Sequence, residues 1–210
     1  MNLYLTRALV PYDITARRWK DDGFRDSYAW HKRIWECFPD RPEASRDFLT
    51  RLDDSGTGFR LLLLSASPPI KPDWCPEPGW ESKAVKEEFL SHPRYRFSLL
   101  ANPTKKIRSN AKGEILKNSR RVSLTTREEL LAWLERKAAL HGFTLTPEEI
   151  RIIPRPSQSF LKRGIGGLHT ATEFSGILTV TDAQLLRHAF VSGIGSAKAF
   201  GFGMLCLSPL

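Results

Sequence analysis

The stretch from Asp26 to Pro42 carries residue types with which the chain could transfer a proton. Tyr28 and His31 are three positions apart, so they are neighbours if this stretch is helical. Lys32 and Trp35 fall on the same stripe of such a helix. An unperturbed histidine titrates near pH ~6.5 and can give or take a proton at neutral pH. Two interpretations stay open: His31 is an acid or base, or it is an ordinary half-buried interface residue.

The surrounding sequence predicts the helix that would position these side chains. Asp26 or Ser27 can cap its start by accepting a backbone N–H. Pro39 cannot continue a helix, so this one should end near Phe38. The stripe that carries His31 should face outward, while a second stripe faces the core. The predicted core-facing residues are Trp30, Ile34 and Phe38.

Metal-dependent hydrolysis has little support in the sequence. The acidic pairs consist of adjacent residues, which point in different directions on helices and strands. There is no H-E-x-x-H motif and no Cys/His cluster. Cys37, Cys75 and Cys206 are far apart, so neither a metal cage nor a disulfide framework is expected. A metal site built from distant carboxylates stays open as an alternative, but we expect no metal and no cofactor.

RNA can be cleaved without a metal because its 2′-OH can attack the adjacent phosphate. The enzyme must then accept one proton, supply another and stabilise charge on the phosphate. In this hypothesis His31 is the acid/base group and Tyr28 positions or hydrogen-bonds the reacting group. Lys32 either stabilises charge or is an ordinary solvated lysine. Trp35 is interpreted as packing, and His169 is the other histidine with a functional interpretation.

The composition points to a polyanionic partner. The 210 residues carry a formal net charge of +9, with a sequence pI near 9.7; a merely basic soluble protein is the alternative. Basic residues gather in two turn-like segments, 105–121 and 155–163, from which long side chains can reach a phosphate backbone. Together with Lys198, the predicted RNA contacts are Lys105, Lys106, Arg108, Arg120, Arg121, Arg155, Lys162 and Arg163.

A glycine-rich segment, residues 193–203, has two interpretations. It is not a dinucleotide fingerprint, because it follows a helix and precedes a strand, and it lacks the P-loop pattern. Its glycines either let the backbone approach a ligand closely or serve a tight turn with positive φ. The residues concerned are Gly193, Gly195, Gly201 and Gly203.

Three blocks of the chain resemble the CasE family, the CRISPR repeat-processing endoribonucleases of the type I-E Cascade complex. They are the Tyr-x-x-His helix followed by W-x-x-F-P-x-R-P, the block FSLLANP at 97–103, and the tail GIGSAKAFGFGMLCLSPL at 193–210. Their order and spacing agree with the family and bracket nearly the whole chain. The resemblance implies a metal-independent endoribonuclease that binds the stem-loop of CRISPR repeat RNA, cleaves at the base of the stem, and acts with other Cascade subunits.

The resemblance also implies roles for individual segments. The family's catalytic histidine matches His31, and its glycine loop lies near bound RNA and the catalytic helix. The alternative is a non-catalytic tandem RRM-like module that only binds RNA. An RRM would carry an aromatic RNP1 pattern on a central strand, and Tyr95-Arg-Phe97 matches that pattern poorly.

The order of the predicted elements gives the fold class. In the second half, strands at 95–101, 151–154, 172–180 and 204–207 and helices after Thr126 and over 182–192 follow the ferredoxin-like order. The first half fits less cleanly, with a strand at 2–10, a loop at 13–25, helices after Asp26 and over 43–52, and a strand at 59–66. Residues 68–79 and 155–169 are predicted loops. For 80–90 the pattern favours a helix, whereas the resemblance implies a closing strand.

The family's architecture is two such domains in tandem. We therefore expect an α+β fold with ferredoxin-like domains at 1–92 and 93–210, meeting near Pro93. No apolar run approaches the ~20 residues of a membrane span, and the start of the chain is too polar for a signal peptide. A cytoplasmic protein with reduced thiols and no membrane partner is expected.

Overall fold

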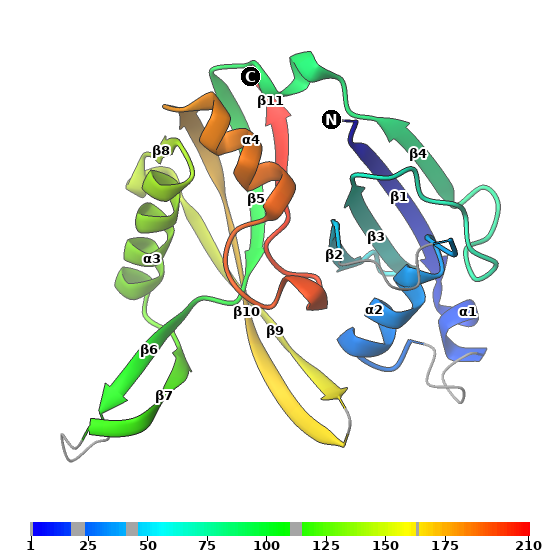
Figure 1. The fold of residues 1–210 in the computed structure, drawn as a ribbon, viewed down its shortest axis with the longest axis horizontal. Helices are drawn as coiled ribbons and strands as arrows, with labels where there is room; N and C mark the ends of the chain where they lie inside the picture. Colours follow the sequence, from blue (N-terminus) through cyan, green and yellow to red (C-terminus); the bar gives the residue numbers. More distant parts are fainter. Residues whose placement is uncertain (1, 18–23, 41–45, 110–114, 163) are drawn as a thin grey trace.

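The computed structural model describes residues 2–17, 24–40, 46–109, 115–162 and 164–210. Two antiparallel sheets lie side by side, each with its own helices (Figure 1). The fold is α+β and consists of two tandem ferredoxin-like units, as predicted.

The first sheet has the strand order β2-β3-β1-β4, with every neighbouring pair antiparallel. This is the ferredoxin-like order, but the connection from β3 to β4, residues 66–79, contains no helix. The elements are β1 (Tyr4–Pro11), α1 (Tyr12–Arg17), α2 (Ser27–Trp35), β2 (Phe48–Asp54), β3 (Gly58–Ser65), β4 (Trp80–Ala84) and the 3₁₀ turn η2 (Glu87–Leu90).

The second sheet has the order β11-β5-β10-β8, and β9 pairs with the long strand β10. Two hairpins, β6–β7 and β9–β10, project from the same side of the molecule (Figure 1). The elements are β5 (Arg94–Ala101), β6 (Thr104–Ser109), β7 (Ile115–Ser123), α3 (Arg127–Leu140), β8 (Phe143–Leu145), η3 (Pro147–Glu149), β9 (Arg151–Lys162), β10 (Ile165–Val180), α4 (Ala183–Ser192), η4 (Lys198–Phe200) and β11 (Leu205–Pro209).

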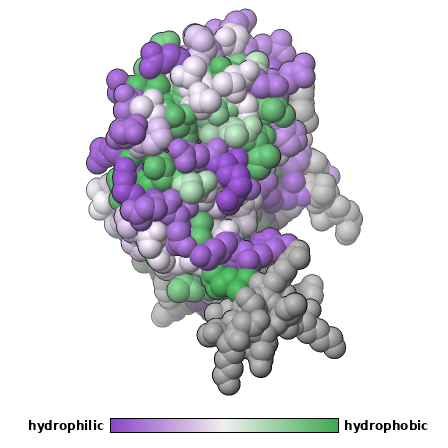
Figure 2. All heavy atoms as spheres, turned by 90° about the vertical axis from the view of Figure 1, so that its left-hand side faces the viewer, coloured by the Kyte–Doolittle hydropathy of each residue, from purple (hydrophilic) through white to green (hydrophobic). Residues whose placement is uncertain are grey.

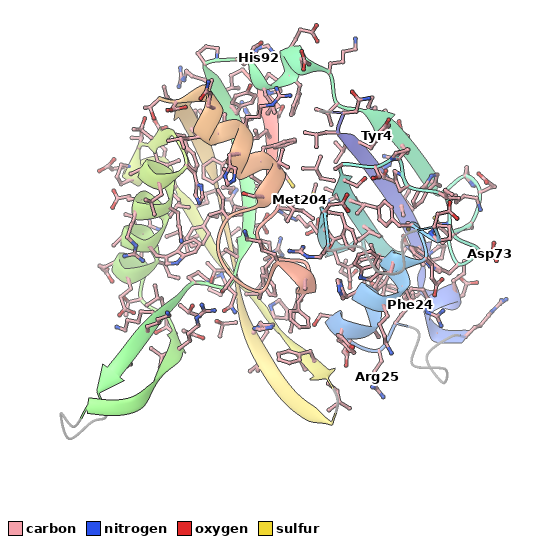
Figure 3. All side chains as sticks on the ribbon, viewed as in Figure 1. Tyr4, Phe24, Arg25, Asp73, His92 and Met204 are labelled. Atoms are coloured by element: carbon pink, nitrogen blue, oxygen red, sulfur yellow. The ribbon has the colours of Figure 1, made fainter. Side chains whose placement is uncertain are left out.

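An apolar seam joins the two sheets. Leu49 and Leu64 from the first sheet pack with Phe190 of α4 and with Met204. Met204 lies between the two halves of the molecule (Figure 3). Because burying apolar surface is the main favourable term in association, this seam holds the sheets in one arrangement.

The predicted helix starts at Asp26 and Thr126 are confirmed, whereas α2 ends at Trp35, three residues before the predicted end near Phe38. Asp26 caps α2 by accepting from the amides of Tyr28 and Ala29, at 2.9 and 2.8 Å. Thr126 accepts from the amide of Glu129 at the start of α3, and Gly142 follows that helix with φ +75°. The predicted core-facing stripe of α2 and the residue beyond its end are buried: Trp30, Ile34 and Phe38.

The predicted helix over 43–52 is wrong where the structure describes it. Residues 46–52 form no helix, and Phe48–Asp54 is strand β2, which pairs with β3; residues 41–45 lie outside the described part. Phe48 packs against α2, whereas Leu49 enters the seam between the sheets. Because both faces of this strand are buried, its sequence lacks the alternation that marks a half-exposed strand.

Three other predicted segments differ from the structure. The loop predicted at 155–169 is a hairpin, in which β9 and β10 pair as far as Lys162 and Ile165. It extends beyond the sheet, so its exposed residues show no apolar pattern. The loop predicted at 13–25 begins with the short helix α1, whose Ile14 packs on the core. Residues 80–84 form the closing strand that the family implies rather than a helix.

On the side that carries α3, hydrophilic and hydrophobic residues are interspersed in small areas (Figure 2). No described helix is both long and apolar enough to cross a membrane.

The three cysteines are free thiols, and burial raises the pKa of the Cys37 thiol to about 12.

Candidate active site

His31 lies on α2 against a small pocket of about 20 Å³. This is space for roughly one water molecule. The imidazole is half-buried, and its Nε2 accepts a hydrogen bond of 3.3 Å from the indole N–H of Trp35, one turn along the helix. The other walls come from four places in the chain: β2 (Thr50, Leu52), β3 (Leu61), β9 (Gln158) and the segment Ala199–Gly201.

Tyr28 and Lys32 share the outer side of α2 with His31, as predicted from their spacing. The Lys32 ammonium lies 5.5 Å from the centre of the Tyr28 ring, within the range of a cation–π contact. Tyr28 is half-buried and Lys32 is exposed. The helix thus presents a phenol, an imidazole and an ammonium along one surface.

The start of α2 is fastened to the β9–β10 hairpin. Besides capping the helix, Asp26 accepts a hydrogen bond of 3.1 Å from the amide of Leu161. The Ser27 hydroxyl donates to the carbonyl of Ser159 at 3.2 Å. These two bonds bring β9 alongside the helix that carries His31. Next to the pocket, a cleft of about 580 Å³ opens between α2, β2 and β9.

The glycine-rich segment forms the other side of the pocket. All four predicted glycines have positive φ: Gly193, Gly195, Gly201 and Gly203. At Gly193 and Gly203 the backbones also pass so closely that a Cβ would lie 3.0 Å from Gly203 O and 2.7 Å from Ile194 O, respectively. Glycine is therefore required for both the turn and the close approach. The result places Ala199–Gly201 beside His31.

The Lys198 side chain already has a partner within the protein, so it is not simply an exposed phosphate contact. Its ammonium donates to the carbonyl of Ser192 at the end of α4, at 2.8 Å, where a cation also complements the helix dipole. Its own carbonyl accepts from Arg46 at 3.1 Å. Burial, together with the nearby cations Arg46 and Lys137, lowers the pKa of Lys198.

The predicted RNA contacts have different environments. Lys106 and Arg121 are exposed and face each other across the β6–β7 pair. Lys105 is exposed too, but its ammonium lies 2.6 Å from a Glu129 oxygen. Arg163 lies outside the described residues, as do the side chains of Arg108, Arg120 and Lys162.

His169 is packed among aromatic rings rather than presented to the His31 pocket. Its ring lies 4.7 Å from that of Phe160 and 4.9 Å from that of Phe200, centre to centre. Its Nδ1 lies 3.1 Å from the amide nitrogen of Asn102. Burial lowers the pKa of His169. The cluster ties the β9–β10 hairpin to the glycine-rich segment.

A buried polar network behind the pocket was not predicted from the sequence. We call it the Glu173 network. Glu173 on β10 accepts from Arg51 of β2 at 2.8 Å and from Ser98 of β5 at 2.8 Å. Its other oxygen accepts two hydrogen bonds from Arg155 of β9, at 2.7 and 2.5 Å. Arg51 also donates to Asp53 at 3.0 Å. The network therefore joins strands of both sheets.

The charge of Glu173 follows from these contacts. Burial disfavours the carboxylate, but hydrogen bonds from Arg51, Ser98 and Arg155 outweigh it and lower the pKa to about 2. The carboxylate is therefore ionised at neutral pH. Across the described ranges, no group of three or more His, Cys, Asp or Glu side chains is placed to hold a metal ion.

Comparisons with known proteins cover the whole chain. A family model described as CRISPR associated protein matches residues 3–209. The CRISPR system Cascade subunit CasE of Escherichia coli (strain K12) is 35% identical, over 99% of this chain and 100% of that protein. The CRISPR-associated endoribonuclease Cse3 of Thermus thermophilus is 27% identical, over 99% and 100%.

A solved structure agrees with these matches. Thermus thermophilus Cse3 bound to an RNA that represents a pre-cleavage complex superposes with a TM-score of 0.74 and 27% identity, over 100% of both chains. Sequence and fold thus agree along the full length. The chain belongs to the CasE/Cse3 family of CRISPR-associated proteins.

Proposed function

We propose that the protein is an endoribonuclease that cuts CRISPR repeat RNA and serves as a subunit of a Cascade complex. The E. coli relative is named a Cascade subunit and the Thermus relative an endoribonuclease. The observation that carries the proposal is the position of His31, half-buried on α2 between the glycine-rich segment and β9. A proton-transfer group is thereby held where three segments of the chain converge.

The proposed reaction is an attack of the RNA 2′-OH on the adjacent phosphate. The P–O5′ bond breaks, and the products are a cyclic 2′,3′-phosphate and a 5′-hydroxyl. The 2′-OH loses its proton and the leaving 5′-oxygen gains one, and His31 is the acid/base group for one of these two transfers. Tyr28 hydrogen-bonds or orients the reacting group, and Lys32 contributes positive charge near the developing oxyanions. No metal ion takes part.

Recognition of the RNA is assigned to the projecting hairpins. An A-form stem hides its bases in a narrow major groove, so phosphate contacts and shape carry much of the binding. Lys106 and Arg121, exposed on the β6–β7 hairpin, fit this role. We further propose that the chain divides into domains at 1–92 and 93–210, near Pro93, and that it acts in the cytoplasm.

The test is cleavage of a repeat stem-loop by the purified protein in excess EDTA. We expect cleavage to continue, with a 5′-hydroxyl on one fragment and a cyclic 2′,3′-phosphate or 3′-phosphate on the other. His31→Ala should reduce the rate by about 10²–10⁴-fold and still bind RNA, because phosphate contacts elsewhere hold it.

Two results would contradict this proposal. Cleavage of an RNA whose 2′-OH at the cut site is replaced by hydrogen would mean that water is the nucleophile. Tight binding of the stem-loop by the wild-type protein without any cleavage would favour the alternative, a non-catalytic RNA-binding module.

A further inference from the structure

The Glu173 network lies between the two sheets, and its central pair is buried. The side chains of Arg51 and Glu173 are 7% and 11% exposed. Arg155, by contrast, is 49% exposed and reaches Glu173 from the rim of the large cleft. The network therefore runs from the buried Arg51–Glu173 pair to the rim of the large cleft.

The network is one residue away from the pocket wall on β2. Successive side chains of a strand point to opposite faces. Arg51 faces Glu173, while its two neighbours, Thr50 and Leu52, face His31. Arg51 is thus separated from each of these wall residues by a single peptide unit.

The same network also reaches the opposite wall. Arg155 lies on β9, three residues before Gln158, which lines the pocket with His31. Ser159 and Leu161, a little further along β9, are the residues that bond to the start of α2. Both walls of the pocket are thus tied to one carboxylate, on β2 through Arg51 and on β9 through Arg155.

The guanidinium–carboxylate contacts of Glu173 are suited to holding two strands at a fixed distance. A guanidinium binds a carboxylate in a fixed planar geometry, and charge-assisted bonds are the stronger kind. A buried ion pair is weak support for stability as such. Its role here would be to fix the distance between the strands that it joins.

We propose that Glu173 and Arg155 are positioning residues, which hold β9 at a fixed distance from β2 and so set the width of the pocket around His31. This inference rests on the proposed ribonuclease function. It assigns Arg155 a role that differs from the phosphate contact predicted from its charge. The difference can be measured, because a phosphate contact acts on affinity and a positioning residue acts on the rate of the bound RNA.

The experiment measures single-turnover cleavage of a repeat stem-loop at saturating protein, and the Kd for the same RNA with its cut-site 2′-OH replaced by hydrogen. Arg155→Ala should slow the saturated rate by about ten- to a hundredfold, because a misplacement of about 1 Å can have that effect. The Kd should stay within about twofold. Arg155→Lys restores one charged donor and should recover part of the rate.

The matched control is Arg151→Ala, which removes an exposed arginine from the same strand. It should leave rate and Kd unchanged. Glu173→Gln tests the carboxylate itself, and its rate should fall at least as far as that of Arg155→Ala. A thermal unfolding curve for each variant shows that it is folded; if Glu173→Gln unfolds, the half-exposed Arg155 still carries the test.

Two outcomes would overturn the inference. Arg155→Ala with a normal saturated rate, a weaker Kd and a salt slope lowered by roughly 0.7–0.9 would make Arg155 a phosphate contact. Normal rates and affinities in all variants would leave the network without a role in the reaction. Failure of the proposed function looks different, because the wild-type protein itself would then bind the stem-loop without cutting it.

Discussion

The indole N–H of Trp35 donates to Nε2 of His31 at 3.3 Å, one turn along the same helix. The bond fixes the imidazole relative to α2, and it requires the lone pair of Nε2 in the neutral ring. Trp35 itself is held by Phe48 of β2, with ring centres 5.0 Å apart. Trp35 thus orients the proposed acid/base group as well as filling the core.

Trp35→Phe should therefore slow cleavage while the protein stays folded. A phenyl ring keeps much of the packing on Phe48 but cannot donate to His31. A neutral hydrogen bond has a net value of about 0.5–1.5 kcal/mol, so we expect a rate reduced by a few-fold to about tenfold. The measurement is single-turnover cleavage at saturating protein. In a His31→Ala background the same substitution should have no further effect, and an undiminished effect there would separate Trp35 from His31.

Tyr28→Phe tests the Tyr28 hydroxyl, which lies on the same side of α2 as His31. If the hydroxyl bonds to a charged reacting group, its loss should slow cleavage by about ten- to a hundredfold, since such bonds contribute about 1.5–3 kcal/mol. Affinity for the stem-loop should barely change. Tyr12→Phe is the matched control, because the Tyr12 hydroxyl bonds to Asp54 away from the pocket. Equal rates for wild type and Tyr28→Phe would reduce Tyr28 to a packing residue.

The basic β6–β7 hairpin should govern the salt dependence of RNA binding. Replacing Lys105 and Lys106 by alanine should weaken binding and lower the salt slope by roughly one for each RNA phosphate that the variant no longer neutralises. Lys105 is paired with Glu129, so Lys106→Ala alone should account for more of the loss than Lys105→Ala. Lys83→Ala, on β4 of the other sheet, is the control. A slope that stays unchanged in the double variant would place the RNA elsewhere.

The parts of the site that sequence could predict depend on local signals. Helix α2 was predictable because its cap at Asp26, the block at Pro39 and the apolar stripe lie within a few residues of one another. The pair His31 and Trp35 was placed on one stripe for the same reason. Its hydrogen bond could have been anticipated from the i, i+4 spacing, which brings side chains together.

The parts that sequence could not predict depend on pairing between distant segments. Strand β2 is buried on both faces by elements from both halves of the chain, so its helix-like pattern is overridden. Arg51 and Glu173 are 122 positions apart. Nothing in one sequence says that these two charges meet, and a buried glutamate looks the same as a solvated one until the sheets are packed.

The last prediction concerns acid stability and follows from the same pair. Breaking a buried ion pair by removing one partner costs about 3–5 kcal/mol, so Glu173→Gln should lower the free energy of unfolding by about that amount at pH 7. The pKa of Glu173 is lowered from 4.5 to about 2. A lowered carboxyl pKa contributes stability that is fully present above the unfolded value and is lost as pH falls through the folded value.

The stability difference between wild type and Glu173→Gln should accordingly be constant above about pH 5 and shrink between 4.5 and 2. Urea unfolding of both proteins across this range measures it. Glu135→Gln, which removes an exposed carboxylate from α3, controls for the loss of one acidic group and should stay close to wild type at pH 7. If the free energies of unfolding of wild type and Glu173→Gln were already nearly equal at pH 7, the Glu173 carboxylate would contribute nothing to the stability of the protein.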